Sequence, residues 1–190
     1  MQILSELKEY AQNSDVPIIQ DETLQFLLDL VEKKKITSIL EIGTAIGYSA
    51  LWMSTIASVQ KIVTLERNYG LAQIAQANIK RAGQSKVIQV INEDALNYSA
   101  TDKFDLLFID GAKAQYQKFF DRYCANAEYI VVDNIDFHGM VENPSLTTNR
   151  NTRAMVKKIA KFKEAMLENQ DYDCRYYAKG DGILLITKRK

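Results

Sequence analysis

Residues 39–49 read ILEIGTAIGYS, and this stretch decides the fold that we expect for the chain. An apolar run containing the acid Glu41 is followed by two glycines and then by a helical pattern. Gly43 permits a tight turn out of a strand, and Gly47 lets the next helix begin close to a ligand. An acid at a strand end, followed by glycines, is typical of a crevice that binds a nucleotide-type cofactor.

Short apolar runs alternate with helical patterns from Ile36 onward. The expected strands are Ser38–Ile42, Lys61–Leu65, Val87–Ile91, Phe104–Ile109 and Tyr129–Val132. The expected helices between them are Tyr48–Ser58, Gly70–Ala82 and Ala114–Cys124. Strands separated by such crossovers predict an α/β fold with a mostly parallel central sheet and helices on both faces.

The flanking segments predict further elements of the same domain. The expected elements are two amphipathic helices, Ile3–Gln12 and Asp21–Glu32, a later helix, Thr152–Glu168, and two strands, Asp173–Tyr177 and Ile183–Thr187. We expect the two strands to form an antiparallel hairpin at the sheet edge. No repeat or linker divides the chain, so residues 1–190 are expected to form a single domain, with residues 1–35 as a helical cover.

Composition narrows the classes of protein that remain. Lys and Arg number 24 and Asp and Glu number 24, so no net charge draws the chain toward nucleic acid or membrane, and an RNA contact needs a local patch. Two cysteines, Cys124 and Cys174, are too few for a disulfide framework. The start of the chain shows no signal-peptide pattern, and no apolar run approaches a membrane span, so we expect a soluble cytoplasmic protein.

The glycine spacing and two later acids describe the expected cofactor. The spacing G-x-x-x-G lacks the extra glycine with which dinucleotide-binding proteins accommodate a pyrophosphate, and this favours a cofactor without phosphates. Glu66 ends the second strand, where a carboxylate can accept both ribose hydroxyls, and Asp94-Ala95 follows the third strand, where an adenine could lie. The alternative is that the glycines only build a turn and that Glu66 is a solvated acid.

Two acidic pairs and a lysine predict a metal-assisted reaction. Asp110-Gly111 and Asp133-Asn134 each end a continuously apolar strand, and Lys113 lies three residues after Asp110. Two carboxylates and an amide oxygen suit Mg²⁺, with positions left open for substrate oxygens. Lys113 is a candidate general base or electrostatic partner of an oxyanion. The alternatives are that both pairs form turns and that the lysine is solvated.

These motifs resemble the S-adenosylmethionine-dependent methyltransferases of the Rossmann-like class. Within that class they are similar to the small O-methyltransferases that include catechol and caffeoyl-CoA enzymes, and most of all to the bacterial tRNA 5-hydroxyuridine methyltransferases. The matching segments are Ile39–Ala50, Glu66–Asn68, Asp94–Leu96, Asp110–Phe120, Asp133-Asn134, Arg150–Lys158 and Gly180–Gly182. The resemblance covers nearly the whole chain, and its Asp-x-x-Lys and Asp-Asn motifs are more specific than its glycines.

The resemblance implies a role for each matching residue. S-adenosylmethionine would contact Ile19, Glu41, Gly43, Ser49, Glu66, Asp94, Ala95 and Asp110. Ile19 lies in a segment that closes over the cofactor, Glu41 and Gly43 lie at its methionine end, and Ser49 lies near its carboxylate. Mg²⁺ or another divalent cation would be held by Asp110, Asp133 and Asn134. Lys113 and Asp110 would be the catalytic residues.

The resemblance also implies an acceptor and partners. We expect methyl transfer to the 5-hydroxyl of 5-hydroxyuridine at the tRNA wobble position, with Arg150, Arg153 and Lys157 contacting the anticodon loop, in a homodimer. One alternative acceptor is a catechol-like or hydroxycinnamoyl compound. Two other classes stay open: a nicotinamide-dependent oxidoreductase, which the missing glycine disfavours, and a non-catalytic RNA-binding module.

Overall fold

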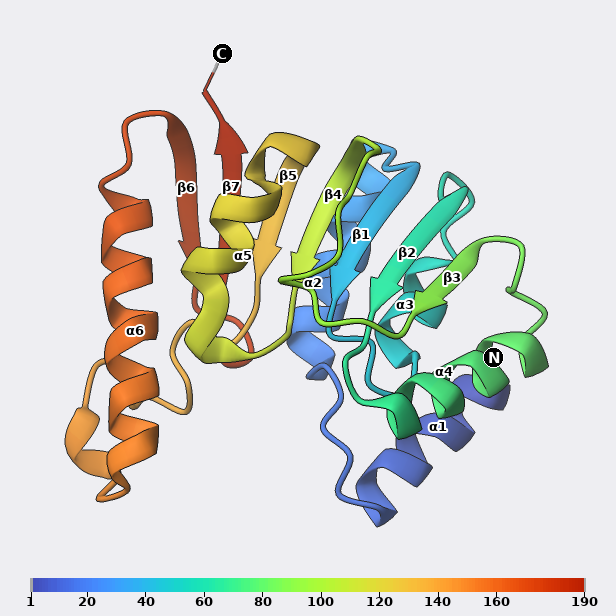
Figure 1. The fold of residues 1–190 in the computed structure, drawn as a ribbon, viewed down its shortest axis with the longest axis horizontal. Coiled ribbons are helices and arrows are strands. Elements are labelled where there is room, and N and C mark those ends of the chain that lie inside the picture. The colour runs from blue at the N-terminus through green and yellow to red at the C-terminus, as the bar shows by residue number, and fades with distance from the viewer. Residues whose placement is uncertain (1, 190) are drawn as a thin grey trace.

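A seven-stranded sheet forms the centre of the computed structural model, which describes residues 2–189 (Figure 1). Its strands are β1 (Ser38–Ile42), β2 (Lys61–Leu65), β3 (Ile88–Ile91), β4 (Phe104–Ile109), β5 (Ala127–Val132), β6 (Tyr172–Tyr177) and β7 (Ile183–Lys188). They lie in the order β3-β2-β1-β4-β5-β7-β6. The first five are parallel, whereas β7 is antiparallel to both β5 and β6. The predicted Rossmann-like sheet and its C-terminal hairpin are confirmed.

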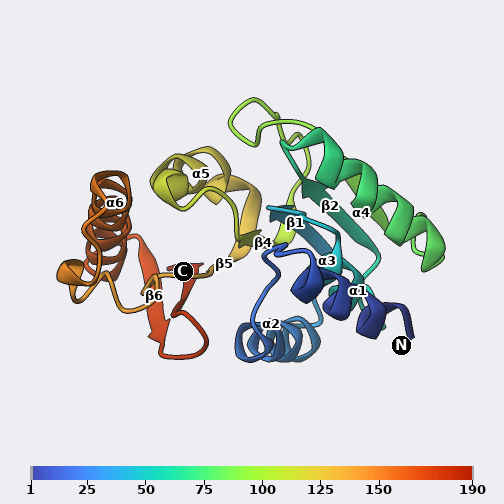
Figure 2. The same ribbon diagram turned by 90° about the horizontal axis from the view of Figure 1, so that it is seen from below.

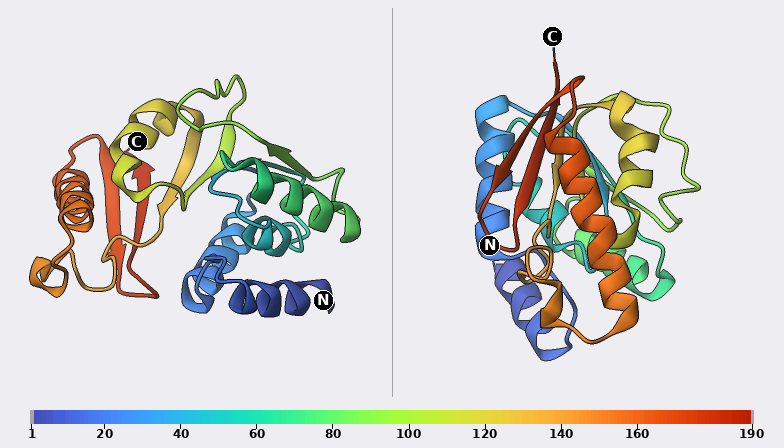
Figure 3. Two further views of the ribbon diagram at one scale, coloured as in Figure 1. Left: turned by 60° about the horizontal axis from the view of Figure 1, so that its bottom comes forward. Right: turned by 90° about the vertical axis from the view of Figure 1, so that its left-hand side faces the viewer.

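Helices cover both faces of this sheet. They are α1 (Gln2–Asn13), α2 (Asp21–Lys34), α3 (Tyr48–Met53), α4 (Tyr69–Arg81), α5 (Tyr116–Tyr123) and α6 (Arg150–Leu167). Figures 2 and 3 show α1, α2 and α3 on one face and α5 and α6 on the other. Helix α4 lies beside β3, and its Ile79 belongs to the core of the first face. No helix in residues 2–189 has the length and apolar composition that crossing a membrane requires.

The sheet separates two apolar cores, because successive strand residues point to opposite faces. In β1, Ile39 packs in the core under α1–α3, whereas Leu40 packs in the core under α5 and α6, and both are almost completely buried. Strand β4 repeats this alternation with Leu106 and Leu107. Burial on both faces explains why these strands read as continuous apolar runs in the sequence.

Two predicted helices are shorter than their sequence pattern suggests. The helix expected over Tyr48–Ser58 ends at Met53, where the hydroxyls of Ser54 and Thr55 donate to the carbonyls of Leu51 and Trp52. Such side-chain bonds compete with continuation of the helix. The helix expected from Ala114 begins with a 3₁₀ turn, Lys113–Gln115, and ends with another, Cys124–Asn126. The sequence pattern locates both helices but not the residues at which they end.

The C-terminal hairpin places β7, not β6, against β5. The turn that precedes β7 also binds the segment that follows β5. The backbone N–H of Ile135 donates to the carbonyl of Gly182, and that of Asp136 donates to the carbonyl of Asp181. The hairpin therefore holds the chain at the carboxyl end of β5. Cys124 and Cys174 form no disulfide, as expected.

Gly43 brings the ends of β1 and β4 into close contact. Its φ is +105°, a region that L side chains rarely adopt. A Cβ atom at this position would lie 2.5 Å from the carbonyl oxygen of Asp110. The adjacent backbone N–H of Asp110 donates to the carbonyl of Ile42 over 2.9 Å. Residue 43 must therefore be a glycine for the two strand ends to meet.

We expect Gly43→Ala to lower the free energy of unfolding by at least about 3 kcal/mol, because it combines backbone strain with a clash against backbone. Gly83→Ala is the matched control. Its φ is +71°, but a Cβ there meets nothing within 4 Å, so we expect a loss of about 1 to 2 kcal/mol from strain alone. Urea unfolding of both variants measures the difference, and equal losses would contradict the close contact at Gly43.

Candidate active site

A cavity of about 500 Å³ opens at the carboxyl ends of the parallel strands. Strands β2, β4 and β5 point toward this end of the molecule in Figure 1. The predicted site residues in its wall are Ile19, Gly43, Glu66, Asp94, Ala95, Asp110, Lys113, Asp133 and Asn134. Open α/β sheets bind ligands at this edge. The cavity therefore joins most of the residues that the motifs singled out, although more than 100 positions separate some of them.

One half of the cavity has the residues expected to contact a nucleoside. Glu66 lies at the end of β2 and is 9% exposed. Its carboxylate accepts from the backbone N–H groups of Ala45 (3.0 Å) and Asn68 (2.8 Å), so its position is fixed by the glycine-rich turn. Asp94 accepts from the N–H of Leu96 over 2.8 Å in a turn that places Ala95 in the cavity wall.

Ile19 closes the cavity from the side of the N-terminal helices. It lies between α1 and α2, follows Pro17 and is 5% exposed. Pro17, Ile18, Ile19 and Gln20 all line the cavity. The segment between the two helices therefore forms part of the cavity wall, and its role as a cover over the cofactor stays a prediction.

Glu41 and Ser49 lie behind the cavity wall and not in it. Glu41 is completely buried in β1, where its two carboxylate oxygens accept from the hydroxyls of Ser49 and Thr64, each over 2.5 Å. Burial raises the pKa of Glu41 to about 7, and the two hydrogen bonds oppose that rise. A direct contact of either residue with a cofactor stays a prediction. In the structure, both support the turn at Gly43.

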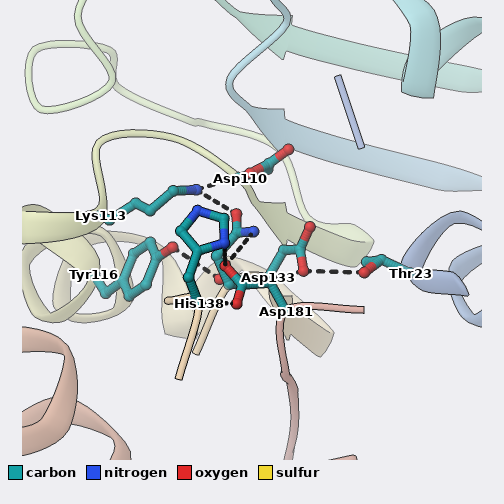
Figure 4. A network of polar contacts seen from close by, with 8 residues as sticks. Thr23, Asp110, Lys113, Tyr116, Asp133, His138 and Asp181 are labelled. Atoms are coloured by element: carbon teal, nitrogen blue, oxygen red, sulfur yellow. Dashed lines mark hydrogen bonds and ion pairs between the residues drawn. The ribbon is translucent and has the colours of Figure 1, made fainter. Parts of the chain in front are cut away.

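The other half of the cavity has a cluster of oxygen atoms around one lysine (Figure 4). Lys113 Nζ donates to Asn134 Oδ1 and lies 3.5 Å from Asp110 Oδ1. Asp133 Oδ1 accepts from the backbone N–H of Asn134 over 2.7 Å. Asp110 follows β4 and Asp133 follows β5, and because these strands are neighbours, both residues line the same cavity. Asp110, Asp133, Asn134 and Lys113 therefore lie together in the cavity wall, and their role as a metal site stays a prediction.

The charges of this cluster suit a cation. Burial and, to a smaller extent, the negative charge of Asp110 together raise the pKa of Asp133 to about 7. Burial also raises the pKa of Asp110, and Lys113 opposes that effect. In residues 2–189, no group of three or more His, Cys, Asp or Glu side chains could hold a metal ion. A divalent cation would therefore need the Asn134 amide oxygen as the third donor, which is the donor set that Mg²⁺ accepts.

Two residues that support this cluster could not be identified from the sequence. Thr23 in α2 is completely buried, and its hydroxyl donates to Asp133 Oδ1 over 3.2 Å. The hydroxyl of Tyr116 in α5 donates to the carbonyl of Asp133 over 2.8 Å. Thr23 lies 110 positions before Asp133, and neither belongs to a local motif that includes the acid. For Thr23, the only signal in the sequence was a polar residue on the apolar face of an amphipathic helix, which does not indicate its partner.

The basic residues expected to contact RNA are exposed but lie outside the cavity wall. Arg150, Arg153 and Lys157 are in the first turns of α6, and Arg153 Nε donates to the carbonyl of Thr147 over 2.8 Å. In Figure 1, α6 begins at the same end of the molecule as the cavity. His138, the one histidine of the chain, lines the cavity.

Comparison with known proteins gives a consistent set of relatives. A family model described as O-methyltransferase matches residues 1–189. A catechol O-methyltransferase from Niastella koreensis is 33% identical over 138 residues, which cover 67% of this chain and 61% of that protein. The chain thus spans less than two thirds of this relative.

Solved structures share the fold over almost the whole chain. A Staphylococcus aureus protein, provisionally assigned as a caffeoyl-CoA O-methyltransferase, is 31% identical with a TM-score of 0.93, covering 98% of this chain and 92% of that one. The O-methyltransferase from Bacillus cereus, in complex with S-adenosylhomocysteine, has a TM-score of 0.85 at 24% identity, covering 100% of this chain and 91% of that one. At that identity, the second likeness concerns the fold alone.

We expect Glu41→Gln to change how stability depends on pH. The folded state binds this proton more tightly than the unfolded chain, since burial raises the pKa of Glu41 from its ordinary 4.5 to about 7. Its contribution is full below pH 4.5 and is lost as the pH rises through 7, a loss of up to about 3 kcal/mol. The variant should lose less unfolding free energy between pH 5 and pH 8 than the wild type in urea titrations.

The exposed Glu128→Gln is the control for this change and should follow the wild-type profile. A Glu41→Gln profile parallel to that of the wild type would mean that the buried carboxylate does not couple folding to pH.

Proposed function

We propose that this chain, which belongs to the O-methyltransferase family, transfers a methyl group from S-adenosylmethionine to one hydroxyl of a small catechol-like acceptor. The observation that supports this most is the arrangement of two unlike halves in a single cavity. Carboxylates at the ends of β2 and β3 suit a nucleoside, and the cluster of Asp110, Asp133, Asn134 and Lys113 suits an oxygen nucleophile. The cofactor bound to the Bacillus cereus protein of the same fold supports this assignment of the first half.

In this proposal, residues that line the cavity have the following tasks. Glu66 accepts hydrogen bonds from the ribose hydroxyls, and Asp94 with Ala95 receives the adenine. Ile19 excludes water from above the cofactor. Asp110, Asp133 and Asn134 would hold a divalent cation, which when bound would lower the pKa of the acceptor hydroxyl.

Lys113 acts on the acceptor hydroxyl itself. Its Nζ takes up the hydroxyl proton or, as an ammonium, stabilises the oxyanion that remains. The oxygen then bonds to the methyl carbon while the carbon–sulfur bond breaks, which gives a methyl ether and S-adenosylhomocysteine. Tyr116 and Thr23 keep Asp133 in place during this step through their hydrogen bonds.

The catechol-like acceptor is preferred because of the named relatives. The Niastella koreensis protein is a catechol O-methyltransferase, and the Staphylococcus aureus structure is provisionally assigned to caffeoyl-CoA, whose acyl ring has the same pair of neighbouring oxygens. Two adjacent oxygens can both approach one cation, and a single ring fits a cavity of about 500 Å³ that also holds a nucleoside.

A second candidate acceptor is 5-hydroxyuridine at the tRNA wobble position, which would become 5-methoxyuridine. Its 5-hydroxyl lies beside the O4 carbonyl, so it also offers two neighbouring oxygens. The observation that favours it is the exposed basic start of α6, with Arg150, Arg153 and Lys157, at the same end of the molecule as the cavity. Such a patch could contact phosphates of an anticodon loop.

Methylation assays with labelled S-adenosylmethionine distinguish these acceptors. We expect the purified protein to methylate a catechol, to lose this activity in EDTA and to regain it with Mg²⁺. A tRNA anticodon stem-loop containing 5-hydroxyuridine is assayed in parallel. Preferred methylation of the RNA would replace the small acceptor with the second candidate. Methylation of neither, together with no binding of S-adenosylmethionine, would overturn the proposed function.

Lys113→Met should lower kcat by at least 100-fold while S-adenosylmethionine binds within about threefold of the wild-type affinity, because only the proton acceptor or oxyanion partner is removed. The exposed Lys118→Met, five residues along, is the matched control and should keep wild-type turnover. Calorimetry of cofactor binding accompanies the rate measurement. Near-normal turnover in Lys113→Met would eliminate its catalytic role.

A further inference from the structure

Asp181 is a buried carboxylate in the turn between β6 and β7, and the proposed function gives it no task. It is 6% exposed. In residues 2–189, the one basic side chain within ion-pair distance of it is His138, whose Nδ1 lies 3.7 Å from Asp181 Oδ2. Burying a carboxylate without a lysine or arginine partner costs free energy unless hydrogen bonds replace its hydration. Its contacts therefore indicate what it does.

Both oxygens of Asp181 face the loop that contains Asn134. Oδ1 accepts from the backbone N–H of His138 over 2.5 Å, and Oδ2 accepts from Asn134 Nδ2 over 3.3 Å. Lys113 contacts Oδ1 of the Asn134 amide, and Asp181 contacts its Nδ2. The carboxylate thus reaches the amide that supplies the third oxygen of the cation cluster.

The two neighbours of this amide differ in hydrogen-bonding type. As an ammonium, Lys113 can only donate, and it donates to Asn134 Oδ1. An ionised Asp181 can only accept, and it accepts from Nδ2. If the amide turned over, Nδ2 would face an ammonium and Oδ1 would face a carboxylate. A single orientation of the side chain therefore satisfies both neighbours.

The backbone at this loop also needs an anchor. Asn134, Phe137 and His138 have φ values of +56°, +43° and +57°, a conformation that non-glycine residues rarely adopt. Such strained backbone persists where the surroundings determine it. Three hydrogen bonds to the turn between β6 and β7 hold this backbone in place. One runs from the N–H of His138 to the carboxylate of Asp181, and the other two come from the backbone N–H groups of Ile135 and Asp136.

We propose that Asp181 is a positioning residue that fixes the orientation of the Asn134 amide, so that Oδ1 and not Nδ2 faces the divalent cation. This inference rests on the proposed function, in which Asn134 holds that cation. Hydrogen bonds to metal ligands typically change metal affinity 10- to 100-fold.

Asp181→Asn reverses this control. In this variant, Oδ1 of residue 181 still accepts from the backbone N–H of His138, so its Nδ2 faces Asn134. Because this Nδ2 is a donor, the Asn134 amide turns over to present its oxygen to it. We expect the affinity for Mn²⁺, followed by electron paramagnetic resonance, to fall at least tenfold. In Asn134→Asp/Asp181→Asn the residues are exchanged, and aspartate at 134 offers an oxygen on either side. We expect this exchange to restore the affinity to within about threefold of the wild type.

Asp136→Asn is the matched control. Asp136 lies in the same loop, is held by Lys163 (2.7 Å) and by the hydroxyl of Tyr176 (2.6 Å), and makes no contact with the Asn134 side chain. It should change Mn²⁺ affinity less than threefold. Wild-type affinity in Asp181→Asn, or no rescue in the exchanged protein, would overturn the inference. A wild-type protein that binds no Mn²⁺ would instead contradict the cation of the proposed function.

A measurement on the wild-type protein tests the hydrogen bond between Asn134 and Asp181 without any metal. The Asn134 side-chain NH₂, identified by its loss in Asn134→Ala, should exchange with solvent at least tenfold more slowly than that of the exposed Asn151 in nitrogen-15 spectra. Equal exchange rates would show that Asp181 does not hold this group and would overturn the inference.

Discussion

The burial of several acidic side chains near the carboxyl ends of the parallel strands is the constraint on which the rest of the site depends. Glu41 and Asp133 are almost completely buried, and Glu66 is 9% exposed. Parallel strands bring these acids to one edge of the sheet, where burial raises the pKa of Glu41 and of Asp133. A fold that needed only stability would not collect them there. Their presence therefore indicates a task, and each acid requires local partners.

Some of these partners are close in sequence to the acid, and others come from distant parts of the chain. Glu41 receives two hydroxyls from α3 and β2, and Glu66 receives backbone N–H groups from the turns around it. The carboxylate of Asp133 accepts a hydrogen bond from the hydroxyl of Thr23 in α2, and its backbone carbonyl accepts one from the hydroxyl of Tyr116 in α5. Helices from both faces of the sheet thus contact one residue, α2 through its carboxylate and α5 through its backbone carbonyl. This arrangement couples the integrity of the site to the packing of the whole domain.

The two halves of the cavity differ in how they hold their groups. Backbone N–H groups bind Glu66 and Asp94, so the nucleoside half depends on turn conformation, and in particular on the approach of β1 to β4 at Gly43. Side chains hold the oxygen cluster, where Lys113 and Asp181 act on opposite sides of Asn134. Side-chain contacts can be altered without changing the fold.

The parallel strands, the helices on both faces and the C-terminal hairpin could be predicted from the sequence, because apolar runs and glycine-rich turns are local patterns. Nine of the predicted site residues line the cavity. The convergence of Asp110 and Asp133 also followed, since both end buried parallel strands. Only the tertiary structure decided that Glu41 and Ser49 lie behind the wall and that Thr23 and Asp181 reach the oxygen cluster. Those contacts join residues 47 to 110 positions apart, and their hydrogen bonds form once packing brings the elements together. No local pattern encodes such a distance.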